Sequence, residues 1–327
     1  MRILVTGGAG FIGSHLCEKL LARGDTVVCI DDFNDYYDPR IKRRNLAGCV
    51  GDPRFRLVEG DIREERVLEE AFSMGPFDVV AHLAARAGVR PSIRDPLLYE
   101  QVNVHGTTLL LEWMRRTGVQ RMVFASTSSV YGANRKVPFS ETDPVDNPIS
   151  PYAATKKACE LICYTYYHLF GIHTTCLRFF TVYGPRQRPD MAIHRFTRLI
   201  DTGKPVPMYG DGTSRRDYTY IDDVLQGVLR AIDGCEGYEI YNLGEARTVA
   251  LAELIRLLEG LLGKKAKIQQ LPEQPGDVPV TFADIRKARE KLGYDPQVPI
   301  EEGLRRFVQW YQEEKRFLYP EDEKEVG

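Results

Sequence analysis

Tyr152 and Lys156 stand four residues apart, a spacing at which a phenol and an ammonium group can share one chemical task. Prolines just before them favour the start of a helix, and four residues make about one helical turn, so both side chains project from the same face. A nearby cation favours the phenolate, and a tyrosine with a lowered pKa can serve as a general base near neutral pH. Tyr311 and Lys315 repeat the spacing in a charged C-terminal helix, so the surrounding sequence must identify the catalytic pair.

A glycine-rich turn lies near the N-terminus, where residues 2–14 read RILVTGGAGFIGS. The pattern predicts an apolar strand, a tight turn and an amphipathic helix that extends to about Arg23. Glycines let backbone amides approach a pyrophosphate, and the helix N-terminus adds unpaired N–H groups. The second predicted strand, 26–30, is followed by Asp31, close to the expected place for a carboxylate that binds a ribose diol. We therefore expect a dinucleotide, and NAD rather than NADP, because Asp31 would repel a 2′-phosphate.

Three features beside this predicted site allow a structural as well as a functional interpretation. The basic residues Arg40 and 42–44 could soften the preference for NAD, or they could form the solvated face of a helix. Ala84 and Ala85 could let a cofactor lie close, or they could allow tight helix packing. His82 is better interpreted as a buried, hydrogen-bonded histidine than as a catalyst.

Strand and helix patterns alternate through the N-terminal half of the chain. After the first two strands, they predict strands at 55–58, 77–82 and 120–125 and helices at 65–72 and 97–116. Such alternation is typical of an α/β fold with a Rossmann-type, doubly wound parallel sheet covered by helices on both faces. Ligands of such sheets bind beyond the carboxyl ends of the strands. That edge would carry Asp61, Ile62, Leu83, Ala84, Ala85, Ser126 and Thr127.

The pattern becomes less regular after about Arg178. It predicts helices at 191–202, 221–233, 251–262, 285–292 and 301–315. We predict a dinucleotide-binding domain at 1–180, to which segments near 215–245 return. Residues 181–327 would form a smaller mixed α/β lobe that closes over the crevice.

Composition excludes several classes of function. The 327 residues carry a net charge of −2, which predicts no binding to nucleic acid or to an anionic membrane surface. No apolar run approaches the roughly 18 residues of a membrane span. The sequence begins directly with a predicted strand, which leaves no room for a signal peptide, so we expect a cytoplasmic protein. Seven scattered cysteines favour reduced, buried thiols and no metal site.

The order of these motifs along the chain resembles the extended short-chain dehydrogenase/reductase superfamily. The resemblance covers nearly the whole chain and rests on the glycine-rich turn, Asp61-Ile62, 82–85 (HLAA), Asn103, Thr127 and Tyr152 to Lys156. Five further stretches narrow it to the nucleotide-sugar epimerases and, within them, most resemble the UDP-glucuronate 4-epimerases. These stretches are 34–37 (NDYY), 87–90 (AGVR), 179–184 (FFTVYG), 188–192 (RPDMA) and 274–278 (QPGDV).

The resemblance implies roles for the central residues. Tyr152 would take the proton of the sugar O4, Lys156 would activate it and bind the nicotinamide ribose, and Thr127 would hydrogen-bond to O4. Thr127 stands where most relatives carry Ser, but the hydroxyl is kept. Relatives that dehydrate sugars or decarboxylate UDP-glucuronate usually have an acidic residue at the next position. Ser128 stands there instead, which argues against both reactions.

The resemblance also implies the remaining contacts with NAD and with a UDP-sugar. The residues expected at NAD are Gly7, Gly10, Phe11, Ile12, Gly13, Asp31, Asp32, Asn34, Asp61, Ile62, Leu83, Ala84, Ala85, Asn103, Tyr152 and Lys156. Those expected at the UDP-sugar are Arg90, Thr127, Ser128, Ser129, Thr181, Arg188, Pro207, Met208, Tyr209, Arg216 and Asp277. Among them, Arg216 would pair with the diphosphate and Asp277 with the uridine ribose, while Thr181 and Arg188 would hold a sugar carboxylate.

The leading hypothesis is NAD-dependent C4 epimerisation of UDP-glucuronate to UDP-galacturonate, through a 4-keto sugar that turns in the site and is reduced again. A UDP-glucose 4-epimerase is the alternative, and a catalytically silent nucleotide-binding sensor is a minor one. The resemblance further implies a homodimer that pairs the helices of Asn103 and Tyr152. Leu109, Leu110, Leu161 and Ile162 could serve that interface or could face the sheet.

Overall fold

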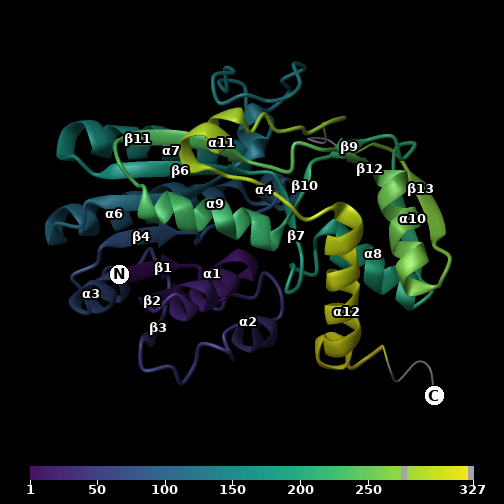
Figure 1. Ribbon diagram of the computed structural model, residues 1–327, viewed down its shortest axis with the longest axis horizontal. Coiled ribbons are helices and arrows are strands. Elements are labelled where there is room, and N and C mark those ends of the chain that lie inside the picture. The colour runs from purple at the N-terminus through teal and green to yellow at the C-terminus, as the bar shows by residue number, and fades with distance from the viewer. Residues whose placement is uncertain (274–277, 323–327) are drawn as a thin grey trace.

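A seven-stranded parallel sheet is the largest element of the computed structural model, which describes residues 1–273 and 278–322. The strand order is β11-β6-β5-β4-β1-β2-β3, with helices stacked on both sides (Figure 1). The strands are β1 (Arg2–Thr6), β2 (Thr26–Asp31), β3 (Phe55–Glu59), β4 (Val79–His82), β5 (Arg121–Thr127), β6 (His173–Phe179) and β11 (Tyr238–Leu243). This architecture confirms the predicted α/β fold with a Rossmann-type parallel sheet.

Alternation along each strand divides the core between the two faces of the sheet. In β1, Ile3 and Val5 enter one apolar cluster and Leu4 enters the other, because successive side chains of a strand point to opposite faces. Both faces are buried, which explains why these strands are apolar runs rather than alternating ones. Helices α1 (Phe11–Ala22) and α9 (Ile221–Asp233) cover the first face, and α3 (Glu65–Ser73), α6 (Gly106–Thr117) and α7 (Pro151–Phe170) cover the second.

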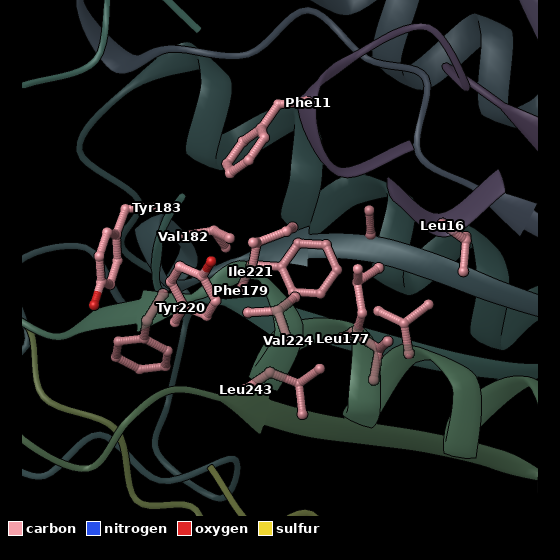
Figure 2. Packing of buried hydrophobic residues seen from close by; sticks show 14 of the residues in the cluster. Phe11, Leu16, Leu177, Phe179, Val182, Tyr183, Tyr220, Ile221, Val224 and Leu243 are labelled. Atoms are coloured by element: carbon pink, nitrogen blue, oxygen red, sulfur yellow. The ribbon is translucent and has the colours of Figure 1, made fainter. Parts of the chain in front are cut away.

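The first cluster is the larger of the two and continues beyond the sheet. Leu177 of β6 and Leu243 of β11 pack with Val224 of α9, and Phe11 of α1 lies close by (Figure 2). The same cluster includes Phe307 and other residues of the helices that follow the sheet region. Apolar packing therefore joins the large sheet to the C-terminal part of the chain.

A smaller region surrounds the carboxyl end of the sheet with three two-stranded sheets. They pair β7 (Thr181–Tyr183) with β10 (Tyr218–Tyr220), β9 (Arg215–Arg216) with β12 (Val249–Ala250), and β8 (Pro205–Tyr209) with β13 (Lys267–Leu271). Helices α8 (Ala192–Asp201), α10 (Leu251–Leu262) and α12 (Ile300–Leu318) complete it, and α10 packs against the other two. In Figure 1 these elements form the right-hand side of the molecule.

Most predicted elements lie within about two residues of their observed ends, including the helices predicted at 221–233, 251–262 and 285–292, the last of which is α11 (Arg286–Leu292). The single helix predicted at 97–116 is confirmed, because α5 (Pro96–Tyr99), the π-helical turn η1 (Glu100–His105) and α6 follow one another without a gap. The π-helical turn was not predicted, and the side chain of Asn103 within it bonds to Arg86 and Thr155 outside the helix. The helices α2 (Pro39–Asn45) and α4 (Val89–Arg94) were not predicted.

Candidate active site

A cavity of about 470 Å³ lies beyond the carboxyl ends of the parallel strands. Most of the predicted site residues share it, although they come from many separate segments of the chain. Those that line it are Gly7, Gly10, Phe11, Ile12, Gly13, Asp31, Asp32, Asn34, Asp61, Ile62, Leu83, Ala84, Ala85, Thr127, Ser128, Ser129, Tyr152, Lys156, Thr181 and Arg188. The carboxyl edge of a parallel sheet is where such folds bind ligands, so the placement follows from the topology.

The remaining predicted residues lie outside the lining of this cavity. They are Asn103, Arg90, Pro207, Met208, Tyr209 and Arg216, while Asp277 falls outside the described residues. Arg90 of α4 and Tyr209 of β8 nevertheless meet, with the guanidinium 4.5 Å from the centre of the ring. A side chain of the sheet region thus reaches the smaller region at the place where uracil was expected.

The turn between β1 and α1 has room for backbone only. Gly7 has a positive φ of 70°, and a Cβ added there would lie 2.7 Å from the backbone nitrogen of Ala84. A Cβ on Gly13 would lie 2.1 Å from the carbonyl oxygen of Gly7. Gly10 caps α1 without a side-chain hydrogen bond, so the first N–H groups of this helix stay available at the cavity wall. These features fit the pyrophosphate of a dinucleotide.

Asp31, at the end of β2, is held rigidly by the backbone around it. Its Oδ2 accepts a hydrogen bond from the backbone N–H of Ala9 at 2.9 Å, and its Oδ1 accepts one from Phe33 at 3.0 Å. Burial raises the pKa of the Asp31 carboxyl, against the lowering effect of these hydrogen bonds and of the Lys42 cation. The carboxyl therefore faces the cavity in a fixed orientation, as a ribose-binding group must.

The basic residues Arg40 and 42–44 were interpreted either as cofactor contacts or as a solvated helix face, and the structure contains both kinds. Lys42 is buried, lines the cavity and donates a hydrogen bond from Nζ to the carbonyl oxygen of Asn34 at 2.8 Å. Arg40, Arg43 and Arg44 are mostly exposed and pair with carboxylates on the surface. One cation of this cluster thus belongs to the site, and the sequence did not single it out.

Helix α7 places Tyr152 and Lys156 at the cavity. The helix begins at Pro151, where the Ser150 hydroxyl accepts a hydrogen bond from the backbone N–H of Ala153 at 3.1 Å, and this cap fixes its first turn. Lys156 follows one turn later, is buried, and donates a hydrogen bond from Nζ to the carbonyl oxygen of Ala125 in β5 at 2.8 Å.

The expected effect of Lys156 on the pKa of Tyr152 is wrong for this structure. Burial raises the pKa of the Tyr152 phenol, and a hydrogen bond with Thr127 and the charge of Arg188 only oppose that rise. Burial also lowers the pKa of Lys156. The Lys156 ammonium group is hydrogen-bonded to the backbone of β5, whereas the Tyr152 side chain is partly buried and lines the cavity. The phenolate therefore needs stabilisation from groups that bind in the cavity.

Hydroxyl groups form a short strip beside Tyr152. Thr127 ends β5, and its Oγ1 accepts a hydrogen bond from the backbone N–H of Ser129 at 3.1 Å and lies 3.2 Å from the Ser129 Oγ. Ser128 lies between these two residues and completes the strip. It is also the first residue of the 3₁₀ turn η2 (Ser128–Tyr131). The residue after Thr127 therefore brings a hydroxyl to the cavity and no carboxyl group.

Arg188 brings a positive charge to the same cavity from the loop before α8. Its Nε and Nη2 donate to the two carboxylate oxygens of Asp190 at 3.0 and 2.9 Å, and its guanidinium lies 5.4 Å from the centre of the Tyr36 ring. Burial would lower the pKa of Arg188, but Asp190 more than compensates and raises it. Arg188 stays charged, and a ligand carboxylate must use another edge of the guanidinium or displace Asp190.

Sequence reasoning missed several residues of the cavity wall, namely Tyr36, Tyr37, Lys42, Arg63 and Arg86. Arg86 follows the predicted segment at the end of β4 directly, and its Nη1 donates to the Asn34 Oδ1 at 2.9 Å. Tyr36 lies within the NDYY stretch, in which only Asn34 was assigned a role. Both positions could have been found from their neighbours, because each is adjacent to a residue that was predicted.

Two residues support the site from behind. Asn103 bonds through its side chain to the backbone N–H and carbonyl of Arg86 and, at 3.1 Å, to the Thr155 Oγ1 on α7. His82 is fully buried, and its two ring nitrogens bond to the hydroxyls of Thr6 and Thr107. Burial lowers the pKa of His82 to about 3, so the ring is neutral and structural, as predicted.

The described residues were also compared with the expectations about metal sites, cysteines and membrane spans. Among residues 1–273 and 278–322, no group of His, Cys, Asp and Glu side chains could hold a metal ion. The seven cysteines are all free and buried, as expected from their scattered positions. Within the described part of the chain, every helix is too short or too polar to cross a bilayer.

Known proteins share this sequence and fold. A family model described as GDP-mannose 4,6 dehydratase matches residues 4–307. The chain is 46% identical to a UDP-glucuronate 4-epimerase of Thermodesulfobacterium geofontis, over 95% of this chain and 96% of that protein. Its structure is similar to that of a UDP-glucuronic acid 4-epimerase from Bacillus cereus in complex with UDP-glucuronic acid and NAD, with 38% identity, a TM-score of 0.90 and coverage of 96% and 99%.

A structure with a different substrate is almost as similar. The UDP-glucose 4-epimerase of Thermotoga maritima, solved with UDP-glucose, shares 36% identity and a TM-score of 0.89, with coverage of 96% of this chain and 99% of that one. The fold alone therefore does not distinguish between an acidic and a neutral sugar, and the side chains at the sugar end of the cavity must do so.

Proposed function

This chain belongs to the GDP-mannose 4,6 dehydratase family, and from that membership we propose that it is an NAD-dependent UDP-glucuronate 4-epimerase. The observation that carries the substrate is Arg188, which shares one cavity with Tyr152 and with the hydroxyl strip of Thr127 and Ser128. Such an enzyme is an isomerase that interconverts UDP-glucuronate and UDP-galacturonate. The names of the similar proteins support this proposal, and so does the cation at the sugar end of the cavity.

The cavity fits NAD as its cofactor. The N-terminus of α1 and the glycine turn would hold the pyrophosphate, Asp31 would bind the adenosine ribose, and Asp61 and Ile62 would flank the adenine. Bound NAD supplies an acceptor and donor of hydride for the sugar C4, so the overall reaction involves no net oxidation. Gly7 and Gly13 leave no space for a side chain, so the turn would contact the pyrophosphate through its backbone.

Tyr152 is the proposed acid and base. Its phenolate oxygen would accept the proton of the sugar O4 as the 4-ketone forms, and the resulting hydroxyl would return the proton after the sugar has turned. Thr127, which lines the same cavity, would orient O4 toward the phenol. Lys156 is held by the carbonyl oxygen of Ala125 and would bind the nicotinamide ribose.

The uronic acid creates a further problem, because its carboxylate lies beta to the transient ketone and could leave as carbon dioxide. Arg188, with Thr181 and the hydroxyls of Ser128 and Ser129, would fix the carboxylate in an orientation that disfavours loss of carbon dioxide. The hydroxyl of Ser128 is not an acid or base strong enough to assist elimination. These residues therefore favour epimerisation over dehydration and over decarboxylation.

We place the UDP anchor in the smaller region, on the proposed domain 181–327. Pro207, Met208 and Tyr209 would hold the uracil, with Arg90 closing over Tyr209, and Arg216 would pair with the diphosphate. Strong binding of UDP would let the sugar turn between its two orientations while the nucleotide stays in place. A UDP-glucose 4-epimerase is the second candidate, because Asp190 already pairs with Arg188 and a neutral sugar would leave that pair intact.

We also propose a homodimer. Leu97 is 72% exposed and Leu161 is 56% exposed, on α5 and α7 respectively, whereas Leu110 is fully buried in the core. Exposed apolar residues on adjacent helices are typical of an interface. Light scattering at micromolar concentration should give about twice the mass of the chain, and a monomer would contradict the proposal. Free, buried thiols suit a reducing compartment, so we propose a cytoplasmic location, to be checked by cell fractionation.

Product analysis tests the proposed function. Purified protein with NAD should convert UDP-glucuronate to UDP-galacturonate, observed by NMR, without release of carbon dioxide. If UDP-galacturonate does not form, the proposal is wrong. Formation of UDP-galactose from UDP-glucose alone would favour the second candidate and would leave the assignment of Tyr152 and the cofactor intact.

A further inference from the structure

A buried ion pair lies behind the catalytic helix and takes no part in the mechanism described so far. Glu160 of α7 and Arg178 of β6 are 0% and 1% exposed as side chains. Arg178 donates from Nε to Glu160 Oε1 at 2.9 Å and from Nη2 to Oε2 at 2.8 Å. Burial would raise the pKa of Glu160, but the hydrogen bonds and charge of Arg178 lower it, so the carboxylate is ionised.

Stability alone explains such a pair poorly. Taking two charges out of water costs about as much free energy as their attraction returns, and a well-packed apolar replacement is often as stable. The Arg178 Nη1 is also buried without a hydrogen-bond partner, which adds to that cost. The contacts of the pair with neighbouring segments suggest a role in holding them in place.

On one side, the pair fixes the catalytic helix to the end of β5. The Ser126 hydroxyl donates to Glu160 Oε1 at 2.6 Å, and Lys156 Nζ donates to the carbonyl oxygen of Ala125 at 2.8 Å. Two consecutive residues of β5 are thus bonded to two residues of α7 that lie one helical turn apart. Thr127 is the next residue of the strand, so its position relative to α7 is set by these two contacts.

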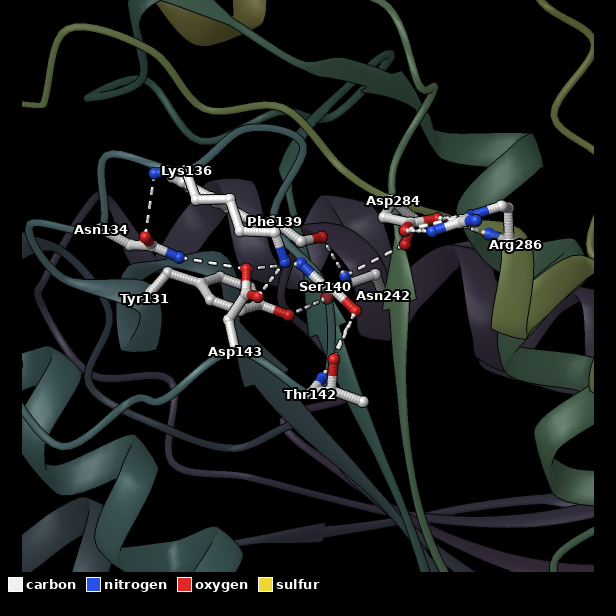
Figure 3. Close-up of polar contacts among 10 residues, drawn as sticks. All are labelled: Tyr131, Asn134, Lys136, Phe139, Ser140, Thr142, Asp143, Asn242, Asp284 and Arg286. Carbon is white, nitrogen blue, oxygen red and sulfur yellow. Dashed lines mark hydrogen bonds and ion pairs between the residues drawn. The ribbon is translucent and has the colours of Figure 1, made fainter.

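On the other side, the pair reaches the turn that follows Thr127. The Arg178 guanidinium lies 4.9 Å from the centre of the Tyr131 ring, at the end of η2. The Tyr131 hydroxyl donates to the Asn242 Oδ1 at 2.7 Å. The Asn242 Nδ2 donates in turn to the carbonyl oxygens of Phe139 and Asp284, and Figure 3 shows it between these groups. The strip of hydroxyls is therefore fixed before its first residue and after its last.

We propose that Glu160 and Arg178 are positioning residues, which hold Thr127 beside Tyr152 in the cavity by fixing α7, β5 and η2 to one another. The pair does not touch the substrate. It acts through Ser126 and Tyr131, and its effect is on the rate of the chemical step and on the phenol, not on binding of the nucleotide. This inference rests on the proposed function, since it concerns the geometry of the proposed base.

The double variant Glu160→Gln with Arg178→Met tests the proposal, because it removes both fully buried charges. Lys157, which pairs with Glu160 at 3.4 Å, keeps its charge, and its side chain is 20% exposed. We expect a melting temperature within about 5 °C of the wild type, retained NAD and a KM for UDP-glucuronate within about twofold. The kcat should fall at least about tenfold. The pKa of Tyr152, measured as the difference in absorbance at 295 nm against the same protein carrying Tyr152→Phe, should rise as its bond with Thr127 weakens.

A matched control is the surface pair Glu302 and Arg305 on α12, whose replacement by Gln and Met should change none of these quantities. A folded double variant with kcat within twofold and an unchanged pKa of Tyr152 would overturn the proposal. If the double variant does not fold, Ser126→Ala decides, because it removes only the bond from β5 to Glu160. Its kcat should fall at least about threefold, and an unchanged kcat would overturn the proposal.

Failure of the proposed function would appear differently. Absence of turnover by the wild-type protein, with UDP-glucuronate and with UDP-glucose, would contradict the enzymatic assignment. The absorbance titration of Tyr152 needs no substrate, so it would still measure whether Glu160 and Arg178 set the environment of that phenol.

Discussion

The large sheet and the smaller region hold their parts of the site in different ways. At the sheet edge, Gly7, Asp31 and Thr127 each end a strand or follow one directly. The strands that hold them are hydrogen-bonded to parallel neighbours. In the smaller region, Arg188 stands in a loop and is held by another side chain, Asp190. We propose that the sheet edge carries the reacting groups, whereas Arg188 of the smaller region selects the sugar.

The largest effect should come from changing the backbone of the sheet edge. Gly13→Ala would bring a Cβ to 2.1 Å from the carbonyl oxygen of Gly7, so the turn must move. We expect a loss of about 3 kcal/mol in the free energy of unfolding, measured in urea, and loss of bound NAD and activity. Gly260→Ala in α10 is the control, since no atom lies within 4 Å of its added Cβ and helical glycine is unfavourable. Equal effects of the two changes would contradict the account.

Tyr152→Phe should be the next largest change, and it should separate chemistry from binding. Loss of the phenolic hydroxyl removes the proposed base, so kcat should fall by roughly 10²–10⁴ while bound NAD and folding are retained. Tyr164→Phe on the same helix, where the ring is 51% exposed, should leave kcat unchanged. Retained activity in Tyr152→Phe would show that another group accepts the proton.

Arg188→Met should show whether the smaller region selects the sugar. Removal of a charged hydrogen-bond donor should lower kcat/KM for UDP-glucuronate by about 10–100-fold and alter that for UDP-glucose by less than about threefold. Arg40, which pairs with Asp38 as Arg188 does with Asp190 but on the surface, offers the matched control Arg40→Met. Equal losses with both sugars would mean that Arg188 has a role unrelated to a carboxylate.

A smaller effect, on stability as a function of pH, should come from the buried carboxyl group of Glu245. Burial raises the pKa of Glu245 to about 8, above its ordinary value of 4.5, and Asp217 and Asp223 add to the rise. The protonated form is favoured in the folded state, so its contribution to stability is full below pH 4.5 and is lost as the pH rises through 8. Glu245→Gln should therefore raise the melting temperature at pH 8.5 relative to the wild type and have little effect at pH 4.5. The same difference at both values would rule out titration of Glu245.

The sequence predicted the sheet edge well for a physical reason. Strand and helix periods identify which residues end a strand, and topology brings those ends together, so Asp31, Ala84 and Thr127 could be placed without coordinates of their neighbours. The superfamily resemblance was confirmed by the family match. The π-helical turn within the predicted helix 97–116 could not be seen in this way, because strand and helix periods do not mark a single wider turn; that turn contains Asn103, whose side chain contacts two other segments.

Properties that depend on packing were harder to predict. The pKa of Tyr152 was expected to be low from its spacing to Lys156, but burial raises it. Lys42 reaches the cavity from the short helix α2 and Arg86 from the irregular segment after β4, and the strand and helix periods marked neither of them. Contacts with the substrate in the smaller region remain predictions, and Asp277 lies outside the described residues.

A competition experiment tests the central claim most directly. Wild-type protein with NAD is given equal concentrations of UDP-glucuronate and UDP-glucose, and the products are followed by NMR. The account predicts that UDP-galacturonate forms at least about tenfold faster than UDP-galactose, because Arg188 recognises the carboxylate. Faster formation of UDP-galactose, or formation of neither product, would contradict it.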